Sequence, residues 1–178
     1  MANTFDLISS IVLTSDTAFG SVSFTSIPAT YTDLRVMVSA RSNRNAADGL
    51  ERVYLYFNGS SSNILMINWT GNSGTSDYSY YDTAGGVGGT VGLCSNQNAP
   101  ANQYGFSDLY INEYTSTTKK IGIACSVIPI GAGGTLNYNF TQSYSHGTTS
   151  PISSITTSGL GSNWLSGSTF YLYGIKKL

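Results

Sequence analysis

The chain has 178 residues and a formal net charge of −1, and 10% of its residues are charged, against roughly 25% in an average globular domain. A nearly neutral chain lacks the excess of Lys and Arg with which proteins bind nucleic acid. Its 40% hydrophobic content excludes wholesale disorder, and no apolar run approaches the roughly 18–20 residues that cross a bilayer. With 27 Ser, 20 Thr, 20 Gly and 13 Tyr, the composition favours strands and turns over solvated helices. It predicts one soluble β domain over residues 1–178.

Segments that are apolar and β-branched, or that alternate between apolar and polar residues, predict five strands in the first 70 positions. The clearest is Leu34–Ala40, in which every second residue is apolar and one face would be buried. Asn58-Gly59 is the usual sequence of a tight hairpin turn, so we expect the strands on either side of it to pair. The predicted segments are Phe5–Leu13, Ser21–Phe24, Leu34–Ala40, Val53–Phe57 and Asn63–Trp69.

The segment from Thr70 to Gln103 is rich in Gly, Ser and Asn. We expect a long central loop region here, rich in Gly, Tyr and Asn. Because a structureless loop of that length would be unusual in a compact domain, two short strands are expected inside it, around Tyr78–Tyr81 and Val91–Cys94.

Five further strands are predicted in the second half, with Lys119–Ile128 expected to be a buried strand. The segments are Phe106–Ile111, Lys119–Ile128, Leu136–Tyr144, Ile152–Thr156 and Phe170–Ile175. No segment favours a helix. An all-β, jelly-roll-like β-sandwich of about 8–10 antiparallel strands is the predicted fold.

No motif in the sequence predicts catalysis, a metal or a cofactor. The single His146 lies in a Gly/Ser/Thr-rich stretch and is expected to be a solvated loop residue. Asp77 and Asp82 have no EF-hand spacing, and Gly85–Gly89 precedes neither a helix nor a Lys-Ser/Thr pair. Nine scattered acidic residues identify no carboxylate pair of the glycosidase kind. We therefore expect a protein that is not an enzyme and has no cofactor.

Cys94 and Cys125 lie far apart in the sequence, and their spacing neither demands nor forbids a disulfide. Because Cys125 sits in an apolar run, a free, buried thiol is the expected state. The N-terminal residues carry neither the basic region nor the apolar core of a signal peptide. Both observations favour folding in a reducing cytoplasm.

Two groups of residues are candidates for binding, and each has two interpretations. Five charged residues within twelve positions form either a surface ion-pair cluster or a protein-contact patch; they are Arg41, Arg44, Asp48, Glu51 and Arg52. Tyrosines in and beside the central segment either cap the rim of the sandwich or contact sugars as adaptable aromatic residues. The candidate glycan contacts are Tyr78, Tyr80, Tyr81 and Tyr104.

The order of several segments along the chain is distinctive: Phe5–Ile8, Ser21–Leu34, Val38–Arg44, Leu55–Gly59 and Phe170–Ile175. In this order they resemble a family of small virion proteins of tailed double-stranded DNA bacteriophages, especially marine and cyanobacterial phages. The block Ser-Ile-Pro-x-Thr-Tyr-Thr-Asp-Leu, which ends at Leu34, is the most specific part. Residues 70–104 carry no matching block.

The resemblance implies a jelly-roll capsid decoration, or cement, protein on the outer head surface of a virion assembled in the host cytoplasm. Its partners would be the major capsid protein and copies of itself, as a homotrimer, with neither nucleic acid nor membrane bound. Besides the charged loop, we expect the N-terminal segment to make contacts, namely Met1, Ala2, Asn3, Thr4 and Phe5. The alternative is a tail-fibre or tail-tip module that binds a receptor or carbohydrate. Neither implies catalytic residues.

Overall fold

The computed structural model of the chain describes residues 4–17, 20–60, 64–72, 75–84, 90–130 and 136–176. Within this set, only the backbone is described for residues 64–66, 68–72, 75–84, 130 and 136–138. The described residues contain no helix long and apolar enough to cross a membrane.

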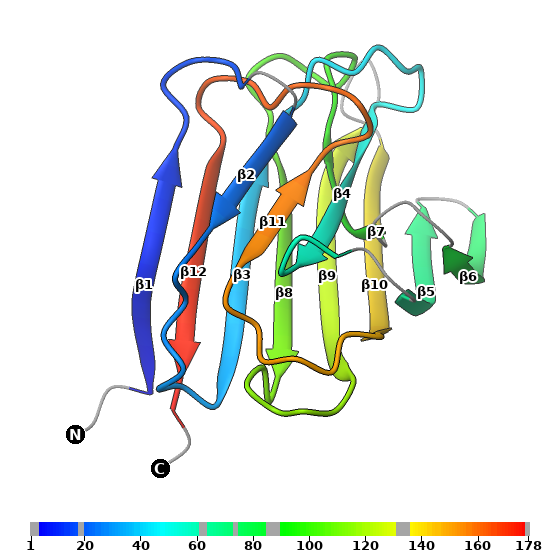
Figure 1. Cartoon of the computed structure of the whole chain (residues 1–178). Helices are drawn as coiled ribbons and strands as arrows, with labels where there is room; N and C mark the ends of the chain where they lie inside the picture. Colours follow the sequence, from blue (N-terminus) through cyan, green and yellow to red (C-terminus); the bar gives the residue numbers. More distant parts are fainter. Residues whose placement is uncertain are drawn as a thin grey trace.

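The described residues form twelve strands in two antiparallel sheets, and the smaller sheet lies against one face of the larger (Figure 1). The eight-stranded sheet has the order β1-β12-β3-β8-β9-β10-β5-β6, and the four-stranded sheet has the order β2-β11-β4-β7. The strands are β1 (Phe5–Val12), β2 (Ser21–Phe24), β3 (Asp33–Ala40), β4 (Leu50–Phe57), β5 (Ile64–Asn72), β6 (Thr75–Ala84), β7 (Thr90–Ser95), β8 (Gly105–Asn112), β9 (Lys120–Ile130), β10 (Leu136–His146), β11 (Ile155–Ser158) and β12 (Thr169–Ile175).

Eight of these strands pair in the nested order of a jelly roll. β1 pairs with β12, β2 with β11, β3 with β8 and β4 with β7. Along the chain these eight strands alternate between the two sheets, except that β4 and β7 both lie in the small sheet. The hairpins β5–β6 and β9–β10 extend the large sheet past β8 (Figure 1). The predicted all-β, jelly-roll-like sandwich is therefore confirmed, with two added hairpins.

Strand β3 shows how the sequence pattern forms the core. Leu34, Val36 and Val38 have no exposed area, whereas the residues between them are partly exposed. Its inner face belongs to the same buried cluster as Leu55 and Phe57 of β4 in the small sheet. The alternation in Leu34–Ala40 therefore predicted the buried face correctly.

The predicted hairpin at Asn58-Gly59 is wrong, although the turn itself forms. Both residues have positive φ, 51° and 74°, as a type I′ turn requires, and Phe57 and Ser60 form an isolated bridge. The chain then leaves the small sheet, and β5 pairs with β10. Strand β4 already lies between β11 and β7, so it has no free edge for β5.

The prediction of a long central loop region is also wrong, because strands occupy more of this segment than expected. The two strands expected inside it are present, as β6 and β7, and they are longer than predicted. Tyr and Ser alternate irregularly in β6, so its hydrophobic periodicity is weak even though its backbone pairs along most of β5.

Candidate functional site

The outer face of the large sheet, which points away from the small sheet, exposes a row of aliphatic side chains on β9. Ile121, Ile123 and Val127 are 54%, 55% and 52% exposed, whereas Ala124 and Ile128 on the other face are buried. The expectation that Lys119–Ile128 is a buried strand is wrong, because the small sheet covers only one face of this strand and the other face is exposed.

The alternation in β9 is inverted relative to an ordinary half-buried strand. Small residues point inward, at Gly122, Ala124 and Ser126, and large aliphatic residues point outward. The small residues are needed because β7 packs closely against the inner face, where the Leu93 backbone N–H donates to Ser126 Oγ at 3.0 Å. Between Gly122 and Ser126, large side chains of β9 therefore have room only on the outside.

Exposed apolar residues from neighbouring strands continue this row. We call the set the outer apolar face and define it as Ile67, Phe106, Ile121, Ile123 and Val127, which are 37–55% exposed. Ile123 pairs with Tyr110 on one side and with Ser143 on the other, and Ser143 pairs with Ile67. The register thus places residues of four strands side by side.

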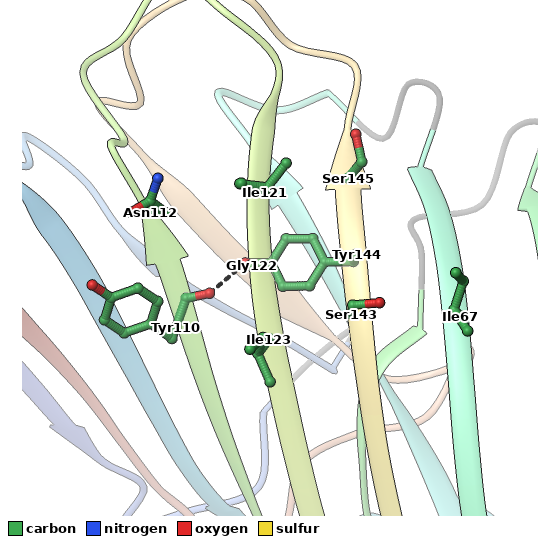
Figure 2. Close-up of a pocket in the computed structure, with 9 residues that line it drawn as sticks. All are labelled: Ile67, Tyr110, Asn112, Ile121, Gly122, Ile123, Ser143, Tyr144 and Ser145. Atoms are coloured by element: carbon green, nitrogen blue, oxygen red, sulfur yellow. Dashed lines mark hydrogen bonds between the residues drawn. The ribbon is translucent and has the colours of Figure 1, made fainter.

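A shallow groove of about 450 Å³ runs across this face (Figure 2). Most of its lining is aliphatic or aromatic, and the polar groups are hydroxyls and one amide. The lining residues are Ile67, Tyr110, Asn112, Ile121, Gly122, Ile123, Ser143, Tyr144 and Ser145. A second hollow of about 290 Å³ adjoins it and includes Phe5, Arg35, Asp108 and Cys125.

Beneath the groove, on the inner side of the sheet, Tyr144 lies in close contact with Gly122. The Tyr144 hydroxyl donates a hydrogen bond to the Tyr110 carbonyl at 3.2 Å, across Gly122 (Figure 2). A Cβ atom at position 122 would lie 2.1 Å from the Tyr110 oxygen and 2.5 Å from the Tyr144 ring. Burial raises the pKa of Tyr144, so the phenol stays neutral and keeps its donor hydrogen.

The charges on the outer face of β3, β8, β9 and β10 neutralise each other. Arg35 Nε lies 2.8 Å from Asp108 Oδ1, and a second guanidinium nitrogen binds Oδ2. The hydrogen bond with Asp108 raises the pKa of Arg35. Apart from the buried carboxylate of Asp33, no other charged side chain is described on this part of the face. The pair is half-exposed, and its bidentate geometry fixes the position of both side chains.

Tyr110 connects this face to a buried acid. Its hydroxyl donates to Asp33, which also accepts the Glu113 backbone N–H at 2.8 Å. Burial and the bond with Asp33 raise the pKa of Tyr110 to about 12. The phenol is therefore neutral and oriented at physiological pH.

Arg41 and Glu51 of the predicted charged cluster are buried, so an exposed contact role for them is wrong. Arg41 donates to backbone carbonyls of the loop before β8, at Gln97, Ala99, Pro100 and Gln103. Glu51 has no exposed area and accepts from Ser42, Arg52, Leu160 and Ser162. Both side chains hold together segments that are distant in sequence.

The remaining predicted contact residues are placed as follows. Arg44 and Asp48 are 3.5 Å apart and partly exposed, and Arg52 is exposed. Thr4 and Phe5 are exposed, and the Phe5 ring lies 5.9 Å from the Arg35 guanidinium. Met1, Ala2 and Asn3 lie outside the described residues.

The predicted glycan-contact residues lie on two separate segments of the chain. Tyr78, Tyr80 and Tyr81 lie in β6, where the side chains are outside the described set. The Tyr104 hydroxyl donates to the Ser166 carbonyl at 2.8 Å. Tyr104 therefore anchors one loop to another.

His146 and the two cysteines also differ from expectation. His146 ends β10 with no exposed area, so its description as a solvated loop residue is wrong. Cys125 is exposed and Cys94 is buried, the reverse of the expectation for Cys125; both thiols are free, as predicted. Within the described ranges, no group of three or more His, Cys, Asp or Glu side chains could hold a metal ion.

The outer apolar face was not predicted, although the sequence contains a signal for it. The run from Ile121 to Val127 alternates large aliphatic residues with Gly, Ala and Ser. Such a run can be buried on both faces or can turn its large residues outward. The small residues at every second position indicate the second arrangement, because a core lined by Gly, Ala and Ser must be filled from the facing sheet.

No protein-family model matches the chain, and no curated protein matches it. The CBM2 module of the evolved Dit of Lactobacillus casei BL23 phage J-1 is 15% identical with a TM-score of 0.27, and covers 89% of this chain and 70% of that one. The structure of infectious bursal disease virus strain Gx is 13% identical with a TM-score of 0.15, over 97% of this chain and 40% of that one. Both likenesses are too distant to identify a family or a function for this chain.

Proposed function

We propose that this chain is a non-enzymatic structural protein of a bacteriophage virion, and specifically a decoration protein of the outer head surface. The observation that carries the proposal is the row of outward aliphatic residues on β9. Scattered exposed apolar residues are ordinary in a monomer, whereas a contiguous apolar patch with a polar rim is typical of a protein–protein contact. A jelly roll with such a patch is suited to binding another protein rather than to catalysing a reaction.

The choice of a virion as the setting rests on the resemblance of the segments ending at Leu34 and at Ile175 to phage virion proteins. A decoration protein acts by adding contact area across neighbouring capsid subunits, and its high copy number makes weak individual contacts sufficient. Its partners would be the major capsid protein and further copies of itself. The exposed residues of the charged loop, Arg44, Asp48 and Arg52, are candidates for the capsid contact.

Antibody labelling of intact virions tests this proposal. Label distributed over the whole head is the expected result, and virions that lack the protein should lose DNA at a lower temperature than complete virions. Label confined to the tail end would contradict the proposal and favour a tail-tip module that binds a receptor or carbohydrate. In that case, binding to a glycan array that is lost in Tyr80→Ala or Tyr81→Ala would identify the ligand.

A further inference from the structure

We propose that the outer apolar face is covered by a second copy of this chain in solution, with Cys125 inside the contact. This inference rests on the proposed function, because it names the partner of the same face. It is carried by three features of the face: its size, its charge balance and the position of Cys125.

The sheet surface that carries the outer apolar face is large enough for a stable interface. Strands β3, β8, β9, β10 and β5 have 8 to 11 residues, so at ~3.3 Å per residue they span about 26–36 Å. Five adjacent strands spaced ~4.8 Å apart give a width of about 24 Å. The resulting area of roughly 750 Å² is close to the about 800 Å² that each partner contributes to a stable protein–protein interface.

The charge balance of the face favours a second copy over a charged partner. Arg35 and Asp108 form a bidentate pair within the face, and the Asp33 carboxylate is buried, so the exposed side chains described on the face carry no net charge to attract an oppositely charged surface. Two copies of a strongly charged face would repel each other, whereas two copies of this neutral face would not. A second copy of the chain therefore supplies the kind of surface that this face can bind, which is apolar and has no net charge among its exposed side chains.

Cys125 lies at the middle of β9, which is at the centre of these five strands. Its thiol is exposed between Ile123 and Val127, and Thr141 Oγ1 lies 3.8 Å from its sulfur. A partner that covers the outer apolar face must also cover this thiol. Cys125 is thus a reporter of the contact, and buried Cys94 is an internal control that should stay unreactive while the protein is folded.

The experiment combines sedimentation with alkylation of the unmodified protein under reducing conditions. We expect the purified chain to associate as its concentration is raised. Over the same concentration range, the rate at which iodoacetamide alkylates Cys125 should fall at least about tenfold, as it would if some nine-tenths of the molecules were associated. Mass spectrometry distinguishes Cys125 from Cys94.

Two variants locate the contact. Ile123→Glu places a charge at the centre of the outer apolar face and should raise the dissociation constant at least about tenfold. Leu160→Glu is the matched control, because Leu160 is 44% exposed in the loop after β11, and it should leave association unchanged. Circular dichroism and urea unfolding establish that both variants are folded.

Three results would overturn the inference. The wild-type chain could remain monomeric at every accessible concentration, or it could associate while Cys125 alkylation stays fast. The third is a chain that is monomeric in solution but whose Cys125 is protected in intact virions. That result would assign the face to another virion protein, and it would leave the proposed function standing, since labelling of the head tests that function separately.

Discussion

The hydroxyl oxygens of Ser107 in β8 and Ser126 in β9 lie 2.8 Å apart on the inner face of the large sheet. Together they bind the backbone of Leu93 in β7. Ser107 donates to the Leu93 carbonyl at 2.7 Å, and the Leu93 N–H donates to Ser126 at 3.0 Å. Ser126 therefore donates to Ser107, which closes the ring of hydrogen bonds. The two serines bind the backbone N–H and carbonyl of Leu93 on the edge of β7 that faces away from β4. These hydrogen bonds join the two sheets.

Replacing Ser126 with Ala should destabilise the fold by about 1–3 kcal/mol, because the buried Leu93 N–H and Ser107 hydroxyl each lose a partner. Urea unfolding measures the change. Ser107→Ala should have a similar effect, and the double variant should be less destabilised than the sum of the two, since both changes break one network. Ser143→Ala, on the exposed face of β10, is the control and should change stability by less than about 0.5 kcal/mol. Full additivity of the two serine variants would contradict the network.

Gly122→Ala should destabilise the protein by about 1–3 kcal/mol through overpacking. The added methyl would meet the Tyr110 carbonyl oxygen, which is backbone and cannot move freely, and the ring of Tyr144. Thermal unfolding measures the effect. Gly59→Asn is a suitable comparison, because no atom lies within 4 Å of a Cβ there and Asn tolerates the positive φ of that turn. Equal losses in the two variants would show that the Tyr110–Tyr144 contact is not the cause.

Glu51→Ala should cost about 3–5 kcal/mol or unfold the chain, because several buried donors would lose a charged acceptor. Glu51→Gln keeps the shape and one acceptor oxygen and should be destabilised less. Arg52→Ala, at an exposed neighbour on the same strand, should change stability by less than about 0.5 kcal/mol. Calorimetry of the three variants checks this order. A large loss in Arg52→Ala with little loss in Glu51→Ala would restore the surface ion-pair interpretation of this cluster.

Stability should decrease as the pH falls below about 6.5, the ordinary pKa of His. The His146 ring is buried, and its Nδ1 accepts the Thr148 N–H at 3.1 Å, so the neutral ring carries its hydrogen on Nε2. Burial and the charge of Lys120 lower the pKa of His146 in the folded protein. Because the unfolded chain takes up the proton first, the free energy of unfolding falls through this range and levels off below the folded pKa.

Urea unfolding between about pH 7.5 and about pH 5 checks the direction, with His146→Gln for comparison. The difference in stability between the wild-type chain and this variant should shrink as the pH falls. A difference that stays constant across the range would show that His146 does not titrate with a lowered pKa.

The strands of the jelly roll could be predicted from the sequence because the residue pattern within each strand shows which of its faces is buried. Where one face of a strand meets a core, as at Val36 and Val38 in β3, hydrophobic alternation records it directly. The position of β8 follows from the same signal, whereas β1 was predicted from its apolar and β-branched residues. Pairing is different, because the partner of β5 depends on which sheet edge is free, and that is decided by β10, far along the chain.

The candidate surface was harder to predict because burial of charged residues depends on tertiary contacts. Arg41 looks like a surface residue until the loop carrying Gln97 and Pro100 folds over it. Ile123 looks like a core residue until the small sheet is seen to cover the opposite face of β9. In both cases the position of a distant segment decides whether the side chain is buried, and the chemistry of the side chain itself predicts its burial less well.

The pairing of β1 with β12 has a consequence for how the chain reaches its folded state. Phe5 lies opposite Ile175, so the outermost strand of the large sheet stays unpaired until the segment around Ile175 has been synthesised. Closing so long a loop is entropically costly, and folds dominated by such contacts form slowly. During that interval the aliphatic side of β9 is exposed in an incompletely paired sheet, an arrangement that favours aggregation of nascent chains.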